Sequence, residues 1–582
     1  MRRMLEYLRP LVGRICTSMS VKFLATLMDL VLPWILAHMI DNVVPKKDMR
    51  MIAVWGGLMV LSAIVCIVGN VIANRTAAAV ARDVTRAIRH DLFTKISYLS
   101  GAQIDGVTIP SLMARLTSDT YNIHRMVGMC QRMMVRAPLL LLGGILITLT
   151  LEPVLTLVLL ATLPFITIVV FLVSRKGIPL YTELQLSVDK LVRTVRENAA
   201  GIRIIKALSK VDYEKERFDA VNREVVGKET KAGTTMAVSN PMMNLFLNAG
   251  LTLVILTGAY RANLGLTSPG TILAFLSYFT IILNAMMAVT RIFVMYSRGS
   301  ASANRIQEVL DLEEDLQLMP QNHVDNGYHI SFEDVSFSYH KGTEDEGSDG
   351  AYRNSVSNIS FALKRGEKLG VIGATGCGKS TVIHLLMRLY DVGEGVIRIN
   401  GDDIRSIPPE ELHTMFGIAF QNDVLFADTI SENIDFGRHL VQSQIHDAAE
   451  FAQAEEFVNS IEENYNYLLT SKGTNLSGGQ KQRLLIARAL AAHPDILILD
   501  DSSSALDYRT DAELRKALHN NFEDTTTIVV AQRISSIMYA DHILVMDEGR
   551  VIGSGNHDHL MQTCEVYREI SESQMGGMGH AG

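Results

Sequence analysis

A glycine-rich turn between an apolar strand and a helix constrains this chain more than any other stretch. Residues Gly373 to Thr381 read Gly-Ala-Thr-Gly-Cys-Gly-Lys-Ser-Thr, which is the spacing of a phosphate loop. The apolar run from Lys368 to Ile372 predicts a buried strand before it, and the apolar residues from Lys379 to Leu389 recur at helical spacing after it. Strand, loop and helix in this order predict an α/β nucleotide-binding domain.

The residue types of this loop predict its ligands. Glycines let backbone N–H groups converge on phosphate oxygens without a side chain in the way. The helix start adds partial positive charge, a lysine reaches the β- and γ-phosphates, and a serine hydroxyl can ligate Mg²⁺. We therefore expect ATP and Mg²⁺ as ligands, bound by Gly373, Ala374, Thr375, Gly376, Cys377, Gly378, Lys379, Ser380 and Thr381.

The half of the chain before Leu312 is more apolar than an ordinary soluble enzyme. Apolar residues make up 48% of the 582 residues, and the mean hydropathy is +0.18. Long apolar segments of roughly 20 residues are what a membrane-spanning helix needs. The sequence predicts six such spans, at about 16–40, 52–74, 126–151, 153–174, 236–261 and 269–294.

Lysine and arginine are unevenly distributed around these six predicted spans. The long connecting segments 75–125 and 175–231 are basic and keep helical periodicity, so we expect them to extend the membrane helices. By the positive-inside rule they lie in the cytoplasm, together with both termini, although three basic residues between 46 and 50 run against the rule. A multi-pass protein of the cytoplasmic membrane, in contact with its lipids, is predicted.

A few asparagines interrupt the apolar spans. Three of them share one face of the fifth span, and Ser277, Thr280 and Asn284 form a similar stripe on the sixth. Polar side chains inside a membrane face a bundle interior or a wet cavity. Hydrogen bonding between helices and contact with a substrate are both open interpretations. The candidates for a substrate cavity are Asn240, Asn244, Asn248 and Asn284.

After Leu312 the composition becomes that of a soluble α/β domain, and further nucleotide motifs follow. Tyr339 is placed to stack on adenine, and Gln421 is a candidate to bind the nucleotide and its Mg²⁺. The apolar run that begins at Ile496 ends in two carboxylates, of which Asp500 is expected to hold Mg²⁺ through water. A Leu-Ser-Gly-Gly-Gln sequence supplies Ser477, Gly478, Gly479 and Gln480.

This set of motifs resembles the nucleotide-binding domain of ATP-binding cassette (ABC) transporters, and the six spans resemble the membrane domain of exporter-type half-transporters. The resemblance covers essentially the whole chain. It implies that two cassettes sandwich two ATP molecules, each between one chain's phosphate loop and the other's Leu-Ser-Gly-Gly-Gln. It also implies coupling helices near 100–112 and 200–210. The expected domains are a membrane domain at 1–312, a cassette at 325–572 and a flexible tail at 573–582.

Two positions depart from the family pattern. Asp501 stands where the family usually has a catalytic glutamate, and Gln532 stands where it has a histidine. The carboxylate of Asp501 is one methylene shorter, and a displacement of about 1 Å can cost roughly 100-fold in rate. Gln532 can hydrogen-bond a γ-phosphate but cannot become cationic. The segment 341–355 is acidic and longer than usual, and it is expected to be a solvated loop.

Together these departures resemble the degenerate-site subunit of a bacterial heterodimeric multidrug exporter. In that interpretation the chain's own ATPase site is impaired, and its intact Leu-Ser-Gly-Gly-Gln completes the site of a homologous partner chain. The expected substrate is an amphiphilic small molecule, a drug or a lipid, and no nucleic acid is expected as a partner. A slow homodimer, an exporter-fold importer and an ATP-gated regulatory membrane protein remain alternatives.

Overall fold

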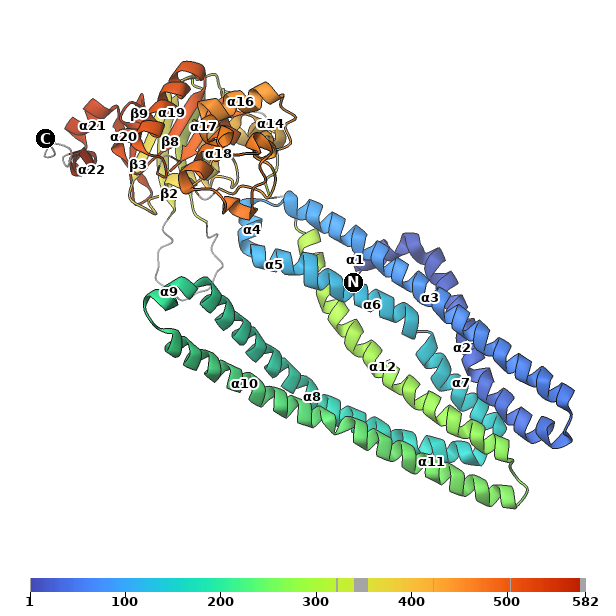
Figure 1. Ribbon diagram of the computed structural model, residues 1–582. Coiled ribbons are helices and arrows are strands. Elements are labelled where there is room, and N and C mark those ends of the chain that lie inside the picture. Colours follow the sequence, from blue (N-terminus) through green and yellow to red (C-terminus); the bar gives the residue numbers. More distant parts are fainter. Residues whose placement is uncertain are drawn as a thin grey trace. The chain divides into compact units, whose positions relative to one another are not determined.

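The computed structural model describes residues 2–313, 315–320, 323–339, 354–421, 423–502 and 504–575. It contains two compact units, one of residues 1–97 and 110–312 and one of residues 98–109 and 313–582 (Figure 1). Most of the acidic segment 341–355 lies outside the described residues.

The first unit is helical. Six of its helical stretches are long and apolar enough to cross a membrane, which confirms the predicted number of spans in the described part of the chain. Its elements are α1 (Arg2–Leu8), η1 (Arg9–Leu11), α2 (Val12–His38), η2 (Met39–Val43), η3 (Val44–Lys46), α3 (Met49–Ser97), η4 (Arg115–Asp119), α6 (Thr120–Met133), α7 (Arg136–Leu151), α8 (Pro153–Ala200), α9 (Ile202–Ala207), α10 (Val211–Ala237), α11 (Ser239–Asn263) and α12 (Pro269–Leu310), and α5 (Ile109–Ala114) leads into η4.

The longest of these helices, α3, α8 and α12, are longer than a bilayer is thick. At 1.5 Å per residue, the 49 residues of α3 extend over roughly 70 Å, more than twice the hydrocarbon core. The basic segments 75–125 and 175–231 lie in α3 to α6 and in α8 to α10. They are therefore helical continuations of the spans, as their periodicity predicted.

The third span is not one continuous helix. It is interrupted at Met134 and Val135, between α6 and α7, which bend relative to each other (Figure 1). Pro138 explains the break, because it has no N–H to donate to the carbonyl of Met134 and its ring crowds that carbonyl. The predicted span at 126–151 therefore lies within a candidate membrane span but consists of two helices, which its hydropathy did not indicate.

Helix α12 packs between other spans through large apolar side chains. Phe275, Tyr278 and Phe279 are buried, and the Tyr278 hydroxyl donates to the carbonyl of Leu30 on α2 at 2.6 Å. Helix α12 also packs against α6, α7 and α11. Helices α8, α10 and α11 pack on one another along the other side of the unit (Figure 1).

The second unit contains two sheets. A six-stranded sheet has the order β10-β9-β3-β8-β7-β6 and is parallel except for β10, and a four-stranded antiparallel sheet has the order β2-β1-β4-β5. The strands are β1 (Ile330–Phe337), β2 (Val356–Leu363), β3 (Lys368–Gly373), β4 (Glu394–Ile399), β5 (Asp402–Asp403), β6 (Phe416–Ala419), β7 (Ile496–Asp500), β8 (Thr526–Val530), β9 (His542–Asp547) and β10 (Arg550–Gly555).

Helices flank these sheets in the described part of the unit. They are α13 (Lys379–Leu386), η5 (Ile404–Ser406), α14 (Pro409–Thr414), α15 (Ile430–Asp435), α16 (Gln442–Phe451), α17 (Glu455–Asn459), η6 (Asn464–Asn466), η7 (Ser471–Gly473), α18 (Gly478–Leu490), α19 (Tyr508–Asn521), α20 (Ile534–Ile537), α21 (His557–Thr563) and α22 (Glu565–Met575). The predicted fold class, a six-span helical domain fused to an α/β nucleotide-binding domain, is confirmed.

Two helix ends differ from the expected ones. Helix α13 stops at Leu386 and not at Leu389, because Arg388 adopts a left-handed φ of 51°. The buried guanidinium of Arg388 donates to the Gln317 carbonyl and to the Asp391 carboxylate. Helix α22 continues to Met575, so the first residues of the expected tail are helical.

A short helix between α3 and α5 belongs to the second unit. This helix, α4 (Gly101–Val107), begins with a capping box in which Ser100 and Gln103 satisfy each other's backbone N–H groups. The Gly101 N–H donates to the Leu389 carbonyl, and the Tyr390 hydroxyl donates to Asp105 at 2.7 Å. Helix α4 lies in the first segment where a coupling helix was expected, and α9 lies in the second.

Candidate functional site

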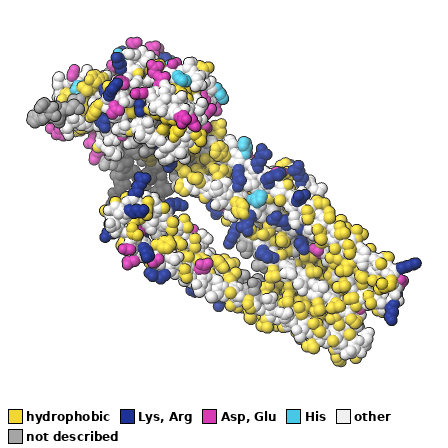
Figure 2. Space-filling model, viewed as in Figure 1, with side chains coloured by type: hydrophobic (Ala, Val, Ile, Leu, Met, Phe, Trp, Pro, Cys, Tyr) yellow, Lys and Arg dark blue, Asp and Glu magenta, His cyan; other side chains and the backbone are white. Residues whose placement is uncertain are grey.

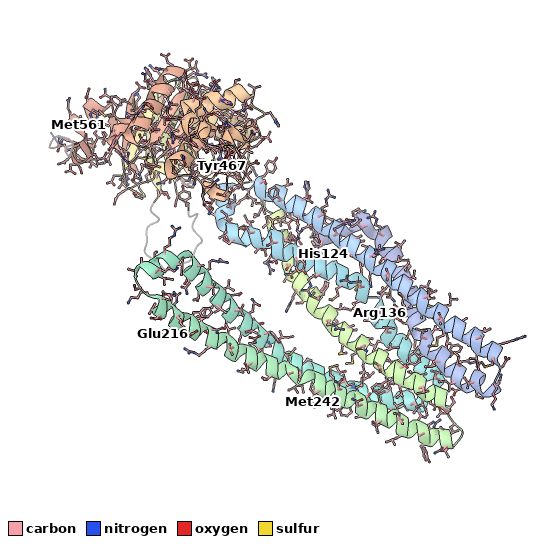
Figure 3. The ribbon with its side chains drawn as sticks, in the orientation of Figure 1. His124, Arg136, Glu216, Met242, Tyr467 and Met561 are labelled. Atoms are coloured by element: carbon pink, nitrogen blue, oxygen red, sulfur yellow. The ribbon has the colours of Figure 1, made fainter. Side chains whose placement is uncertain are left out.

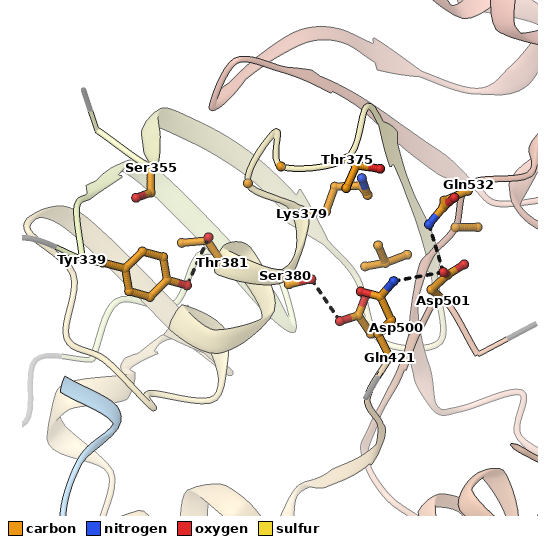
Figure 4. Close-up of a pocket in the computed structure, with 14 residues that line it drawn as sticks. Tyr339, Ser355, Thr375, Lys379, Ser380, Thr381, Gln421, Asp500, Asp501 and Gln532 are labelled. Atoms are coloured by element: carbon orange, nitrogen blue, oxygen red, sulfur yellow. Dashed lines mark hydrogen bonds between the residues drawn. The ribbon is translucent and has the colours of Figure 1, made fainter. Parts of the chain in front are cut away.

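A pocket of about 280 Å³ opens where β3, β7 and β8 end in the six-stranded sheet (Figure 4). Parallel strands end at one edge of the sheet, and ligands of open α/β sheets bind there. The sequence analysis named most of the pocket's residues but not Ser355, Val530 or Ala531. The lining residues are Tyr339, Ser355, Thr375, Gly376, Gly378, Lys379, Ser380, Thr381, Gln421, Asp500, Asp501, Val530, Ala531 and Gln532.

The three residues that the sequence analysis missed have a common explanation. Val530 and Ala531 are apolar residues at the end of β8, and Ser355 precedes β2. Their place beside the loop depends on the strand order, in which β8 lies between β3 and β7. No residue pattern within one segment encodes that order.

Glycine is required in the loop for steric and conformational reasons. A Cβ on Gly373 would lie 2.1 Å from the Met546 carbonyl oxygen, so no larger residue fits there. Gly378 has a φ of +102°, which L residues with side chains rarely adopt. Cys377 lies between these two glycines in the sequence, and it is buried in the apolar core of the domain. The loop therefore keeps a fixed course from β3 into α13.

The loop lysine and serine are directed toward the strand ends. Lys379 Nζ donates to the carbonyls of Gly373 and Ala374, both at 2.9 Å. Ser380 Oγ donates to Asp500 Oδ2 at 3.1 Å, so a hydroxyl and a carboxylate from α13 and β7 converge. A hydroxyl, a carboxylate and the Gln421 amide are oxygen donors of the kind Mg²⁺ prefers, so Ser380, Gln421 and Asp500 suit that ion.

Asp500 is the most deeply buried carboxylate of the pocket. Its residue is 4% exposed, and burial raises the pKa of its carboxyl, while the Ser380 hydrogen bond and the charges of His384 and Lys379 act in the opposite direction. A buried anion of this kind is favoured when a cation is bound beside it. A bound Mg²⁺ would supply that charge and would neutralise phosphate oxygens.

Asp501, Gln421 and Gln532 form a hydrogen-bonded group at the other end of the pocket (Figure 4). Asp501 Oδ2 accepts from Gln532 Nε2 at 3.0 Å and from Gln421 Nε2 at 3.3 Å. Asp501 has a φ of +49°, a conformation that aspartate tolerates better than most residues. Burial raises the pKa of its carboxyl, and the charge of Lys379 and the Gln421 hydrogen bond oppose that shift.

Tyr339 lies at the opposite side of the pocket from Asp501 (Figure 4). Its hydroxyl donates to Thr381 Oγ1 at 3.2 Å and lies 3.2 Å from His384 Nδ1. Its ring meets the Tyr390 ring edge-on at a centroid distance of 5.1 Å. The Tyr339 residue is 40% exposed, so part of it is accessible to a nucleotide base.

The Leu-Ser-Gly-Gly-Gln sequence forms the start of α18, away from this pocket. Ser477 caps the helix: its hydroxyl accepts from the Gln480 N–H, and the Gln480 side chain accepts from the Ser477 N–H. Ser477 and Gly478 are exposed, and Gly479 is half-buried. Among the residues that line the described pocket there is none from 476 to 480. An exposed helix start with free N–H groups can bind a phosphate from another chain.

The asparagines of the membrane helices are partly described. Asn244 and Asn248 of α11 and Asn284 of α12 are exposed. Asn248 Nδ2 donates to the Asn244 carbonyl of its own helix at 2.8 Å. The side chain of Asn240 lies outside the described part of the structure. The side-chain amide of Asn248 therefore bonds within α11, and in the described part of the chain it donates to no other helix.

Comparison with known proteins gives concordant matches. The model of the ABC transporter transmembrane region matches residues 15–286, and the model of the ABC transporter family matches residues 356–504. The chain is 34% identical to the ABC transporter ATP-binding protein YfiB of Bacillus subtilis, over 100% of this chain and 99% of YfiB. It is 30% identical to YknU of the same organism, over 96% of this chain and 94% of YknU.

The fold also matches a solved structure. A bacterial Atm1-family ABC exporter with ATP bound superposes with a TM-score of 0.80, covering 97% of this chain and 98% of the exporter, at 22% identity. At that identity the match shows the fold alone. It gives the chain the fold of an ABC exporter, and the sequence matches show that the chain, with its six candidate membrane helices, belongs to the ABC transporter family.

Proposed function

We propose that this chain is one subunit of a heterodimeric ABC exporter that moves amphiphilic small molecules across the cytoplasmic membrane. In this proposal its own phosphate loop builds a slowly hydrolysing ATP site, and its α18 completes the competent site of a homologous partner. The observation that carries the proposal is the hydrogen bond between Gln532 and Asp501 at 3.0 Å.

That hydrogen bond joins Asp501 and Gln532, the two residues that depart from the family pattern, so each is already engaged by the other. A general base must accept a proton from the attacking water, but Asp501 Oδ2 already accepts two amide hydrogen bonds. Those two bonds hold Oδ2 against the amides, so this oxygen is not free to accept a proton from the attacking water, although burial raises the pKa of the carboxyl. Gln532 donates its amide to Asp501 and has no positive charge to offer a γ-phosphate. Both effects predict slow hydrolysis in a site that still binds nucleotide.

The Leu-Ser-Gly-Gly-Gln sequence, which would complete the ATP site of the partner, has no altered residue. Helix α18 keeps Ser477 as its cap and presents Gly478 in the open. ABC exporters work as dimers, so this surface is available to a second chain. We propose that the partner supplies a glutamate and a histidine at the positions of Asp501 and Gln532. The proposal also places both termini and the cassette in the cytoplasm, where ATP is available.

ATPase measurements on the purified full chain, with and without a partner half-transporter, test this proposal. Because loss of a well-placed general base typically costs ~10²–10⁴ in rate, the chain alone should hydrolyse ATP poorly. Asp501→Glu combined with Gln532→His should raise its turnover, and the control Asp524→Asn, at an exposed position outside the pocket, should leave it low. Turnover by the unmodified chain at the level of an ordinary exporter would overturn the heterodimer in favour of a homodimer.

A further inference from the structure

A polar stripe on α12 becomes basic along its length. Ser277, Asn284, Arg291 and Arg298 are seven residues apart and therefore share one face of the helix. The last three are exposed. The stripe continues the one that contains Thr280, so the asparagine identified as a cavity candidate is followed by two arginines.

The two arginines lack compensating charge. In the described part of the chain no ion pair includes Arg291 or Arg298. No Asp or Glu occurs in α12 before Glu308, whose carboxylate pairs with Arg115. At 1.5 Å per residue, Asn284 lies ~22 Å and Arg291 ~33 Å from the first residue of α12. Arg298 is ~44 Å away, so the stripe runs from inside the ~30 Å hydrocarbon layer at Asn284 to its boundary at Arg291 and past it at Arg298.

A second basic group lies on the helices that pack against α12. Arg136 donates to Asp29 on α2 at 3.1 Å, and it lies at the bend between α6 and α7 (Figure 3). Lys22 Nζ donates to Asn70 and Asn74 on α3, at 2.7 and 3.1 Å. Arg132 and Arg136 both lie close enough to Lys22 for their charges to act on it.

Carboxylates do not balance this group either. Asp29 is the single acidic residue of α2, and its two oxygens are bonded to Arg136 and to the Cys66 thiol. Three cations therefore face one carboxylate, and helices α6 and α7 contain no other acidic residue. Figure 2 shows Lys and Arg side chains gathered over α6 and the neighbouring helices, with few Asp or Glu among them.

An uncompensated cation at the edge of the hydrocarbon layer, such as Arg291, is costly unless it faces water or meets an anion. Arginine is well suited to the second role, because its planar guanidinium binds carboxylate, sulfate and phosphate groups through two parallel hydrogen bonds. A neutral substrate would gain nothing from this arrangement, and a cationic substrate would be repelled by it. The imbalance of charge therefore bears on the class of solute that the transporter moves.

We propose that the solute is an anionic amphiphile, whose carboxylate, sulfate or phosphate group is bound by Arg291 and Arg298 of α12. The Lys22, Arg132 and Arg136 group adds to the positive potential along the same helices. This inference deepens the proposed transport function and rests on it for the direction of movement, but the binding step can be measured without a partner chain or nucleotide.

Binding of three probes with one fluorophore tests the charge preference. The full chain is placed in nanodiscs of zwitterionic lipid, and the affinities of pyrenebutyrate, pyrenebutanol and pyrenebutyl-trimethylammonium are measured without ATP. Pyrenebutyrate should bind roughly tenfold or more tightly than the other two, because only it forms charge-assisted hydrogen bonds with arginine. Equal affinities, or a preference for the cation, would overturn the proposal.

Variants of the stripe assign the effect to α12. Arg291→Gln with Arg298→Gln should weaken pyrenebutyrate roughly tenfold or more and leave pyrenebutanol unchanged. Arg291→Lys with Arg298→Lys should retain part of the affinity, which guards against a folding defect. Arg223→Gln, at an exposed position of α10, is the matched control and should have no effect. Unchanged pyrenebutyrate binding by the double glutamine variant would overturn the assignment.

Two further measurements are informative. One distinguishes a lipid headgroup from a soluble solute as the source of the anion, and the other tests the heterodimer independently of anion binding. Nanodiscs containing phosphatidylglycerol should weaken pyrenebutyrate binding if a lipid headgroup is the natural occupant, and leave it unchanged if a soluble solute is; both results support the anionic class. If the isolated chain proves to be a fast ATPase, the heterodimer is lost, while anion binding in the absence of ATP is unaffected by that result.

Discussion

The nucleotide pocket of the cassette and the start of α18 are two regions of one domain. They differ in how many of their residues match the pattern of the family. In the pocket, Lys379, Ser380 and Asp500 retain everything that phosphate and Mg²⁺ binding require. The residues beyond them, Asp501 and Gln532, are altered and bonded to each other. At α18, the serine cap and the exposed glycine are intact.

This difference separates nucleotide binding from hydrolysis. Binding needs converging N–H groups, a lysine and oxygen ligands, all fixed by the turn from β3 into α13. Hydrolysis adds a base aligned on a water molecule, and a displacement of about 1 Å is enough to lose it. A chain can therefore keep a stable ATP site that holds two cassettes together while it contributes to fast turnover only through α18.

The largest effect is expected from Ser477→Ala in the assembled pair. In the proposed heterodimer this change removes a γ-phosphate contact from the competent site, so turnover should fall by an order of magnitude or more, whereas Asp501→Asn should change it far less. ATPase assays of the purified pair measure both. Thr429→Ala, which deletes the equivalent cap of α15, controls for the loss of helix capping. Equal losses from Ser477→Ala and Asp501→Asn would mean that Asp501 is a working base.

The next largest effect concerns nucleotide binding in this chain's own pocket. Stacking of an aromatic ring on a base is worth roughly 1–3 kcal/mol, so Tyr339→Ala should weaken ATP binding by about tenfold. Tyr339→Phe keeps the ring and loses only the hydroxyl bonds to Thr381 and His384, so its affinity should stay close to the original. Equilibrium binding of a fluorescent ATP analogue separates the two. Equal affinity for both variants would contradict a stacking role.

A smaller effect on substrate-stimulated ATPase is expected from the membrane domain. It does not bear on the difference between the two regions of the cassette. Replacing Asn244 and Asn248 by Leu should change substrate-stimulated ATPase several-fold, because both amides are exposed on α11 and neither is recorded to hold another helix. Basal ATPase and assembly should be unaffected. If the double variant fails to assemble, or if every substrate response is preserved, the asparagines have a structural role.

The sequence predicted the nucleotide pocket well because each motif is local. The loop from Gly373 to Thr381 and the strand ending at Asp500 carry their own turn, strand and helix signals. Two features were not predictable in this way. Ser355 and Ala531 reach the pocket through the strand order, and the contact between Asp501 and Gln532 depends on two chain segments 31 residues apart.

The membrane domain was predictable to a different extent. Hydropathy predicted six spans because each must satisfy its backbone within one helix. It did not predict the break at Met134, whose cause is a single proline within an otherwise apolar run. It also gave no indication that Lys22, Asp29 and Arg136, more than 100 residues apart at the extremes, lie together, since that depends on how α2, α3 and α7 pack.

The smallest expected effect is on thermal stability. It tests whether the nucleotide pocket of the cassette needs a bound cation to offset its buried carboxylate. Burial raises the pKa of Asp500, so its protonated form is favoured in the folded state, and the stability that this provides is present below the pKa of the unfolded chain. That stability is lost as the pH rises through the raised folded pKa, and at neutral pH the buried carboxylate is a cost. Asp500→Asn, which is neutral throughout, should therefore raise the unfolding midpoint of the nucleotide-free chain near pH 7. Each kcal/mol should appear as roughly 2–4 °C in a domain of this size.

The same variant should show no advantage at about pH 4 and below, where the aspartate is itself protonated, and it should gain less stability than the original chain from added Mg²⁺ and ATP. Asp524→Asn, at an exposed position, should shift neither midpoint. Thermal unfolding followed at both pH values, with and without Mg²⁺ and ATP, measures these differences. A lower midpoint for Asp500→Asn in the nucleotide-free state at neutral pH would show that the carboxylate stabilises the fold by itself. The stability of the folded pocket would then not depend on a bound Mg²⁺ ion.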